Sequence, residues 1–516
     1  MKRFMGIVLA LCLLTMPLLG VAQAEEKVTL KVLVVPNILT ADVNELQFLK
    51  DIADKANVNV EWESITTGYT EVHSVMMADG DLPDILLGAG TATTSDFAQF
   101  GYLFADMTEL LDYAPNVQKM FEEKPEIKKM VTSLDGKIYG LSKYQRDWPS
   151  NMCMQMVNKE WLDRLNLAVP TTWDELYDVL VAFRDQDANG NGDPSDEIPM
   201  DWAPGISGFN VTSMVATYGL PISMYQGSGY YVDNGVAGNF FVSDAYKQLI
   251  IFLNKCYTEG LINPDVFTQD YTSFQNLARS GVVGFTFGYD ILDRMGADLE
   301  SQYVSVAPLK PSADYTGEVL WENDYSMMNY AYPMVSISAN CANKEAAMRY
   351  VDTFFDPYYS MQVLFGSMGT CIEDKGDGTY AVLPPADSTV DPGTWKWQNA
   401  LADNGPMYIA DSLKLDLPAD LQKVKQLDSV YDEYHAKFAE NDIWPGPFLK
   451  LDAESDVALA NYNVDLISLF TTNFATWISV GGIENEWDNY IASTTAAGLP
   501  DALAIYQTAL DAYFAK

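Results

Sequence analysis

The sequence predicts an α/β fold with more than one packed domain, and three observations support this prediction. Strand-like and helix-like patterns alternate near the start of the chain, an order that gives parallel strands with helices on the faces of a sheet. The chain has 516 residues, 48% of them apolar, which is enough for two or three domains with buried cores. No internal repeat or low-complexity linker separates the patterns, so the domains are expected to pack closely.

The alternation begins with a predicted strand at residues 28–34, where valine and leucine recur at every second position. A helix is predicted within residues 42–56, because apolar side chains recur there at spacings of three and four. Further strands are predicted at residues 58–62 and 82–87. This strand–helix–strand order favours parallel pairing of the first two strands.

Two later helices have clear boundaries. Thr172 and Glu175 form a capping box at the start of a helix that runs to about residue 184, with Leu176, Leu180 and Phe183 on one face. An amphipathic helix is also predicted at residues 500–516. The first of these helices leads directly into the most acidic loop of the chain.

That loop, residues 185–199, concentrates carboxylate and amide oxygens around Gly190 and Gly192, which permit tight turns. Hard divalent cations take roughly six to eight oxygen ligands, often from alternate positions of a curled loop. We therefore predict a calcium ion here, with a stabilising role. The expected ligands are Asp187, Asn189, Asn191, Asp193, Asp196 and Glu197.

Two alternatives apply to this loop. An EF-hand register would begin at Asp185, with Gly190 at its sixth and Asp196 at its twelfth position. We favour the register that begins at Asp187, because it uses both asparagines and the adjacent carboxylates. The other alternative is a polar turn that binds no ion, since Asn, Asp and Gly are common in turns.

The N-terminus predicts export. Lys2 and Arg3 precede an apolar run at residues 4–21, and small residues follow up to Ala24. This is the order of a secretory signal peptide, residues 1–24, with cleavage expected after Ala24 and a periplasmic or extracellular mature chain. A membrane anchor is less favoured, because Pro17 interrupts the run and no positive charge follows it.

Charge and cysteine content narrow the classes of partner. A formal net charge of −40 repels phosphate backbones, so nucleic acid is not expected as a partner. The chain has only two histidines, so it offers few residues for a histidine-based zinc site or catalytic triad. Four cysteines follow the signal segment and could form up to two disulfides in an oxidising compartment. They are Cys153, Cys256, Cys341 and Cys371.

Five blocks in a fixed order resemble the extracellular solute-binding proteins of ABC sugar importers, specifically their large branch that binds oligosaccharides and alginate. The resemblance covers nearly all of the chain after the signal segment. The blocks are LPDI at 82–85, DGKIYGL at 135–141, NKEWLD at 158–163 with PTTWDEL at 170–176, CANKEAA at 341–347 and EWDNY at 486–490. Members of that branch carry a similar calcium loop, which agrees with the prediction for residues 185–199.

The resemblance implies a type II periplasmic-binding-protein fold, with two lobes, a hinge and a central ligand cleft. One lobe is expected to contain residues 25–145 and 288–334, and the other residues 146–287 and 335–516 with the calcium loop. The chain would cross between them near 144–150, 287–291 and 332–336. Closure of the lobes on an oligosaccharide would present the complex to ABC transporter permease subunits. A monomer is expected.

Cleft residues are predicted where aromatic rings and hydrogen-bonding groups occur together in irregular segments. Aromatic rings can stack on the apolar faces of sugars, while carboxylates, amides and guanidinium groups bind hydroxyls. The segment 144–148, next to an expected crossing, combines both chemistries. The predicted ligand-binding residues are Tyr144, Arg146, Asp147, Trp148, Trp202, Trp321, Glu322, Trp395 and Trp397.

Other classes stay open at this point. An exported polysaccharide-degrading enzyme would use paired carboxylates, which are inevitable among 71 acidic residues and therefore uninformative. A binding protein for a peptide or another small solute would share the expected fold. A calcium-stabilised adhesin would predict repeats or disulfide-rich modules, and neither is visible.

Overall fold

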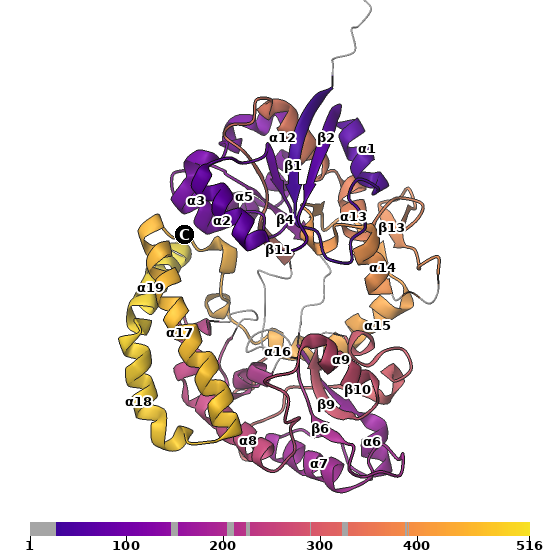
Figure 1. Cartoon of the computed structure of the whole chain (residues 1–516), viewed down its shortest axis with the longest axis vertical. Helices are drawn as coiled ribbons and strands as arrows, with labels where there is room; N and C mark the ends of the chain where they lie inside the picture. Colours follow the sequence, from indigo (N-terminus) through magenta and orange to yellow (C-terminus); the bar gives the residue numbers. More distant parts are fainter. Residues whose placement is uncertain are drawn as a thin grey trace, which may run out of the picture.

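The computed structural model describes residues 27–145, 153–203, 211–222, 228–288, 290–321, 329–387, 390 and 392–515. The chain forms an upper and a lower lobe, with a layer of three long helices along one side of both (Figure 1). We call these helices the strap. They are α17 (Ala453–Ser479), α18 (Ile483–Ala496) and α19 (Leu499–Phe514).

The upper lobe is built on a six-stranded sheet in the order β14–β4–β11–β3–β1–β2. All its strands are parallel except β11, which lies antiparallel between β3 and β4. The strands are β1 (Val28–Val34), β2 (Val58–Ser64), β3 (Ile85–Leu87), β4 (Leu141–Gln145), β11 (Tyr330–Ile337) and β14 (Tyr408–Ile409). The strand predictions at 28–34, 58–62 and 82–87, and the parallel pairing of the first two, are confirmed within a few residues.

Helices cover both faces of this sheet because its side chains alternate between them. Val32 and Ile85 lie in the core cluster that also contains Phe48 of α1, whereas Leu33 and Leu86 face Met76 and Phe97 of α2 and α3. The helices of this lobe are α1 (Gln47–Lys55), α2 (Tyr69–Asp79), α3 (Thr94–Phe100), α4 (Pro115–Glu123), α5 (Pro125–Val131), α12 (Lys344–Thr353), α13 (Pro357–Phe365) and α14 (Pro392–Asn399). A small sheet lies beside them, formed by β12 (Ile372–Asp374), β13 (Thr379–Val382) and β15 (Lys414–Asp416).

The lower lobe contains a four-stranded sheet in the order β10–β5–β9–β6. Its strands are β5 (Met154–Asn158), β6 (Ile198–Met200), β9 (Val283–Gly288) and β10 (Tyr303–Val306), and a separate hairpin is formed by β7 (Tyr230–Asp233) and β8 (Val236–Asn239). Its helices are α6 (Lys159–Arg164), α7 (Trp173–Asp185), α8 (Asp244–Thr258), α9 (Tyr271–Arg279), α10 (Ile291–Met295), α15 (Ala419–Asp428) and α16 (Asp432–His435). Thr172 is the N-cap of α7 as predicted, and its Oγ1 accepts from the Glu175 amide. The Glu175 carboxylate accepts from the amide and hydroxyl of Thr171, so the return bond of the predicted capping box comes from the residue before the N-cap.

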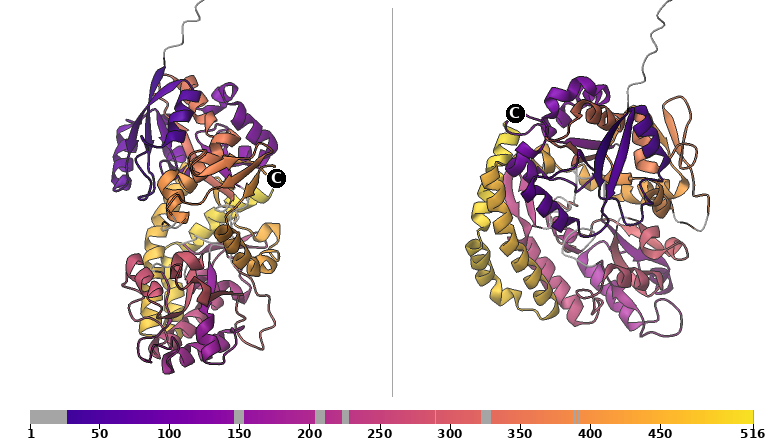
Figure 2. Two further views of the ribbon diagram at one scale, coloured as in Figure 1. Left: turned by 90° about the vertical axis from the view of Figure 1, so that its right-hand side faces the viewer. Right: turned by 45° about the horizontal axis from the view of Figure 1, so that its top comes forward.

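The strap is attached mainly to the lower lobe. Leu466, Phe470 and Trp477 of α17 belong to the same core cluster as Leu249 and Leu253 of α8. At its other end the strap reaches the upper lobe, where Tyr513 packs 6.2 Å from the Phe448 ring. Figure 2 shows these helices alongside both lobes in two further directions. The predicted helix at 500–516 is α19.

Strand pairing corrects two expected lobe boundaries. The chain does pass from the upper to the lower sheet between β4 and β5, as expected near residues 144–150. However, β9 and β10 are both in the lower sheet, so no crossing occurs near 287–291. β11 lies inside the upper sheet, and α12, α13 and β14 pack with it, which places residues 335–417 in the upper lobe. Local sequence patterns do not reveal such long-range pairing.

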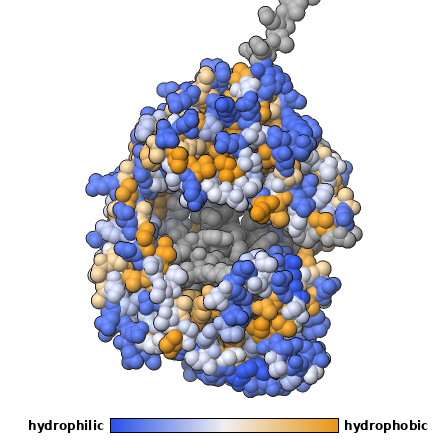
Figure 3. Space-filling view, in the orientation of Figure 1, coloured by the Kyte–Doolittle hydropathy of each residue, from blue (hydrophilic) through white to orange (hydrophobic). Residues whose placement is uncertain are grey.

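The face seen in Figure 1 is hollowed between the two lobes, as the space-filling view shows (Figure 3). The four cysteines among the described residues are buried, and none of them forms a disulfide. In the part of the chain that the structure describes, no helix is both long and apolar enough to cross a bilayer.

Candidate ligand-binding site

Strand direction determines which residues border the hollow. In the upper sheet, the carboxyl ends of the parallel strands β1, β3 and β4 share one edge. In the lower sheet, the carboxyl ends of β6, β9 and β10 share an edge with the start of β5. Because β4 continues into β5 after only a few residues, these two edges face each other. Open α/β sheets bind ligands at such edges.

A network of charges lies at the upper edge. The Asp403 carboxylate lies 2.9 Å from Lys396 Nζ and 3.4 Å from Lys143 Nζ, and it accepts from Gln145 Nε2 at 3.0 Å. Burial disfavours the charge of Asp403, but the two ammonium groups outweigh this and hold its pKa below the usual range. The other amide atom of Gln145, Oε1, is buried and accepts no hydrogen bond within the described chain. Gln145 therefore holds an unpaired acceptor within the described chain, buried at this edge.

Helix α14 places two predicted cleft residues at the same edge. Its Lys396 reaches Asp403, and its Gln398 carbonyl accepts from the Ala41 amide in the loop after β1. Trp395 and Trp397 flank Lys396 and are only partly buried. Lys396 Nζ lies 5.5 Å from the centre of the Trp397 ring. Both tryptophans therefore keep some exposed surface on a helix that is tied to this edge.

At the lower edge, Asp201 and Trp202 follow β6 directly. The Asp201 carboxylate accepts from Asn263 Nδ2 at 3.0 Å, from Gln269 Nε2 at 2.8 Å and from the Trp202 amide at 2.9 Å. Burial raises the pKa of Asp201 to about 6, against the lowering effect of these bonds. Trp202 is only 1% exposed, so its ring packs against protein groups such as Phe267.

Tyr144 and Trp321 lie at the ends of chain crossings and are also buried. Trp321 Nε1 donates to the Cys153 carbonyl at 2.8 Å, which joins two crossing segments at the lower edge. Tyr144 Oη donates to Asp411 at 2.7 Å, and its ring lies 5.1 Å from that of Tyr330. These contacts favour a role in fixing the hinge ends over stacking on a solute.

Four predicted ligand-binding residues lie outside the described residues: Arg146, Asp147, Trp148 and Glu322. In sequence, Arg146, Asp147 and Trp148 are the three residues after Gln145, which ends β4, and Glu322 follows Trp321.

The acidic loop between α7 and β6 curls as predicted. Asn189 Nδ2 and Asn191 Nδ2 donate to the two carboxylate oxygens of Asp196 at 2.8 and 2.6 Å. Asp187 Oδ2 accepts from the Gly192 amide at 3.0 Å, and Glu197 Oε1 accepts from the Asn189 amide at 3.2 Å. Asp193 accepts instead from Ser195. The loop therefore closes on itself through its own side chains.

This geometry fits a hard cation. Asp187 Oδ1 and Glu197 Oε2 are both buried without a hydrogen-bond partner in the described chain, which is costly for carboxylate oxygens unless a cation compensates them. Among the described residues, no three Asp, Glu, His or Cys side chains cluster as a metal centre. Two of the six candidate ligands in this loop are asparagines, which such a cluster does not include. The oxygen-only donor set suits calcium better than zinc.

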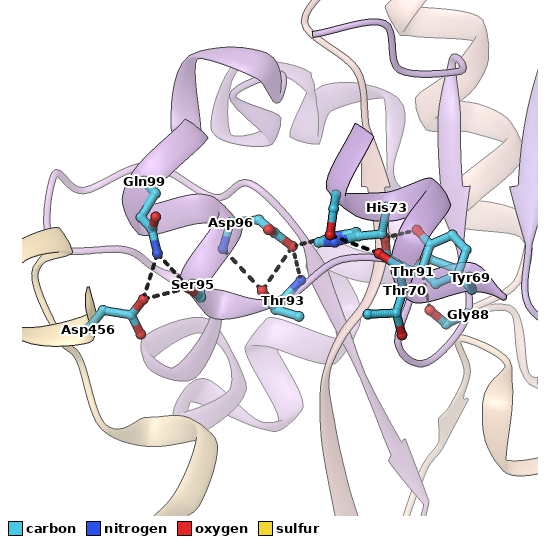
Figure 4. A network of polar contacts seen from close by, with 11 residues as sticks. Tyr69, Thr70, His73, Gly88, Thr91, Thr93, Ser95, Asp96, Gln99 and Asp456 are labelled. Atoms are coloured by element: carbon cyan, nitrogen blue, oxygen red, sulfur yellow. Dashed lines mark hydrogen bonds and ion pairs between the residues drawn. The ribbon is translucent and has the colours of Figure 1, made fainter. Parts of the chain in front are cut away.

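A further polar network links the upper lobe to the strap (Figure 4). Thr93 caps α3 in a capping box with Asp96: Thr93 Oγ1 accepts from the Asp96 amide, and the Asp96 carboxylate accepts from the Thr93 amide. Asp96 also lies 2.9 Å from His73 Nε2, and this bond raises the pKa of His73, although burial opposes it. Asp456 of α17 accepts from Ser95 Oγ at 2.5 Å and from Gln99 Nε2 at 3.0 Å (Figure 4). The two lobes are thus joined by side chains as well as by chain crossings.

The sequence was also compared with known families. The model of the bacterial extracellular solute-binding protein family matches residues 40–358, more than half of the chain. The chain belongs to this family. The resemblance drawn from the five sequence blocks is confirmed, and with it the two-lobed type II fold. Members of the family are binding proteins rather than enzymes.

Two relatives whose names state a ligand match almost the whole length of this chain. The fructooligosaccharide ABC transporter substrate-binding protein FusA of Streptococcus pneumoniae is 27% identical over 95% of this chain and 92% of its own length. An HMO-binding, ABC-transporter-associated solute-binding protein of Bifidobacterium longum infantis is 28% identical, with a TM-score of 0.86 over 95% of this chain and 99% of that one. FusA in complex with kestose gives a TM-score of 0.83 at 26% identity over 94% of this chain and 99% of that one.

Sequence reasoning missed most of the polar groups that order the two edges. Lys143, Asp403, Asn263 and Gln269 come from separate segments and carry no local motif. Gln145 and Asp201 were within the segments singled out, because each adjoins a predicted tryptophan or tyrosine.

Proposed function

We propose that this protein captures an oligosaccharide between its two lobes and delivers it to the permease of an ABC importer. The proposal rests on the agreement in fold over 94% of the chain with a relative whose structure contains kestose. It is supported by an edge that combines partly exposed indole rings, an unpaired amide oxygen and charged side chains. These groups match the alternating apolar and hydroxyl surfaces of a sugar.

Within this site, Trp395 and Trp397 are the proposed ligand contacts of the upper edge. Arg146, Asp147, Trp148 and Glu322 remain proposed contacts, because they lie within three residues of Gln145 or Trp321 in the sequence. Tyr144, Trp202 and Trp321 are proposed to hold the walls and hinge in place, since their rings are buried.

A structural calcium ion is proposed for the loop at 185–199. Asp187, Asn189, Asn191, Asp193, Asp196 and Glu197 would hold it, and the ion would neutralise carboxylates that otherwise repel one another. One relative supports this assignment by its name, an EF-hand mutant of FusA that is 26% identical. The alginate-binding protein AlgQ2 without calcium ion is 21% identical and is similar in fold alone. A signal peptide cleaved after Ala24 and a monomeric mature protein complete the proposal.

Titration calorimetry on the mature, calcium-loaded protein tests the proposed function. The ligands are kestose, nystose, other neutral and acidic oligosaccharides, the corresponding monosaccharides, and short peptides. We expect heat of binding from one oligosaccharide class, with the sugar recovered uncut. Cleavage of the sugar would make the protein an enzyme, and binding of peptides alone would replace the proposed solute class.

A further inference from the structure

Arg164, the last residue of α6, lies against the acidic loop. Its Nη1 donates a hydrogen bond to the Ala188 carbonyl. Its guanidinium also covers Gly190, since a β-carbon built at Gly190 would lie 2.8 Å from Arg164 Cζ and 2.9 Å from Nε. Gly190 has a φ of 77°, so glycine is favoured there both by backbone conformation and by this close approach.

These contacts hold the backbone on both sides of Asn189. That residue is the centre of the loop's own network: its amide nitrogen donates to Glu197, its Nδ2 donates to Asp196, and its Oδ1 accepts from the Asn191 amide. The position of the 188–190 backbone therefore decides whether the side chains of Asn189, Asp196 and Glu197 converge. Arg164 fixes that backbone from outside the loop.

We propose that Arg164 is a positioning residue of the calcium loop, which keeps residues 188–190 curled in the form that gathers the cation ligands. The inference rests on the proposed calcium site. A positive charge near a cation would by itself oppose binding. However, Arg164 is exposed and forms no ion pair with a loop carboxylate within the described chain, so solvent screens that repulsion. Pre-organisation then outweighs it.

Arg184 provides a matched control. It is also an arginine next to the loop, at the end of α7, but it pairs with Asp185 and with the Glu259 carbonyl rather than with loop residues 187–197. Loss of its charge changes the local potential without freeing the 188–190 backbone.

The test is titration of calcium chloride into EDTA-treated mature protein, for the wild type and for Arg164→Ala, Arg164→Lys and Arg184→Ala. We expect the dissociation constant for calcium to rise about five- to tenfold in both Arg164 variants, as loss of a charged hydrogen bond implies, and to change less than twofold in Arg184→Ala. The calcium-induced gain in melting temperature should shrink in parallel. The melting temperature of the calcium-free proteins shows whether each variant is folded.

Two results would overturn the inference. Tighter calcium binding by Arg164→Ala, with Arg164→Lys like the wild type, would mean that Arg164 acts only through its charge. Unchanged affinity in both variants would mean that it does not position the loop. Failure of the wild type to bind calcium is a different outcome, because it removes the proposed cofactor itself.

A second variant tests the contact directly. Gly190→Ala introduces a β-carbon that meets the guanidinium only when Arg164 is present. We expect this substitution to weaken calcium binding more in the wild-type background than in Arg164→Ala, a non-additivity that marks residues in contact. Equal effects in the two backgrounds would contradict the proposed packing.

Discussion

At the scale of single residues, ion pairs between buried and partly buried side chains organise the upper edge of the hollow. Lys143 is buried, and burial lowers its pKa, yet the neighbouring Asp403 carboxylate favours its charged form. Lys396 completes the group and brings α14 against the end of β4. The partly exposed ring of Trp397 is therefore carried on a helix whose position is fixed by ion pairs.

Trp397→Ala should weaken oligosaccharide binding about tenfold, because the lost indole removes apolar contact area beside the ligand. Calorimetry with the best ligand of the panel measures the effect. Trp487→Ala is the matched control: Trp487 is also partly buried and also has a lysine, Lys247, 5.4 Å from its ring centre, but it lies on strap helix α18. Equal losses in the two variants would mean that Trp397 acts through stability and not through ligand contact.

Asp201 predicts a pH dependence of stability. Its pKa is raised to about 6 in the folded protein, so between about pH 4 and 6 the folded state binds more protons than the unfolded state. Its contribution to the free energy of unfolding therefore falls as pH rises through this range, by up to about 3 kcal/mol, and is constant above it.

Denaturant unfolding from pH 3.5 to 7 measures this contribution. Asp201→Asn should show a shallower decline over pH 4–6 than the wild type, because asparagine does not titrate. Asp290 and Asp352 also have pKa values raised to about 6, mainly by burial, so a residual decline is expected. Identical slopes in the two proteins would show that Asp201 ionises normally in the fold.

At the scale of elements, sequence patterns predicted what local periodicity can specify. Strand β1, helix α7 with its Thr172 N-cap and the curled loop after it all follow from residues close in sequence. The insertion of β11 between β3 and β4 depends on pairing across more than 180 residues, and no local signal specifies it. The lobe boundaries near 287–291 and 332–336 were wrong for this reason.

The same division applies to the candidate site. Tryptophan in irregular segments was a useful signal for residues near an edge, but it did not separate rings that border the hollow from rings packed below it. Trp202 and Trp321 are buried because Asp201, Asn263 and the Cys153 carbonyl organise the backbone around them. Asn263 and Cys153 are distant in sequence from the tryptophans, so burial at these positions could not be predicted from composition.

Removal of calcium should destabilise the loop at 185–199 and leave oligosaccharide binding largely unchanged. If the ion is present at 100 times its dissociation constant, it stabilises the fold by about 2.7 kcal/mol. For a protein of this size, chelation should therefore lower the melting temperature by about 3 °C. Differential scanning calorimetry with and without EDTA checks this. Glu197→Gln should be insensitive to EDTA. Oligosaccharide affinity should change less than twofold; its loss at temperatures where the fold persists would place the ion in the cleft.

At the scale of the whole molecule, the two lobes are connected by the chain crossings and by the strap. The crossings are anchored by buried aromatic residues, with Tyr144 and Tyr330 in the upper lobe and Trp321 and Tyr431 in the lower. Tyr431 Oη donates to the Val306 carbonyl and accepts from the Gln155 amide, which ties the hinge to the end of the lower sheet. These two aromatic clusters therefore fix the ends of the chain crossings.

The Asp456 carboxylate joins the strap to α3 through side-chain hydrogen bonds. Loss of this carboxylate should increase local opening of α3. In Asp456→Ala, Ser95 and Gln99 lose their shared acceptor, worth about 1 kcal/mol, so backbone amides of α3 should exchange with deuterium about fivefold faster in the ligand-free protein. Asp465→Ala removes the same charge from an exposed position on the same helix and should leave α3 unchanged. Hydrogen exchange followed by mass spectrometry resolves the α3 peptide. If α3 exchanges equally fast in both variants, the contact at Asp456 does not restrain the lobes, and their relative orientation depends on the chain crossings and apolar packing.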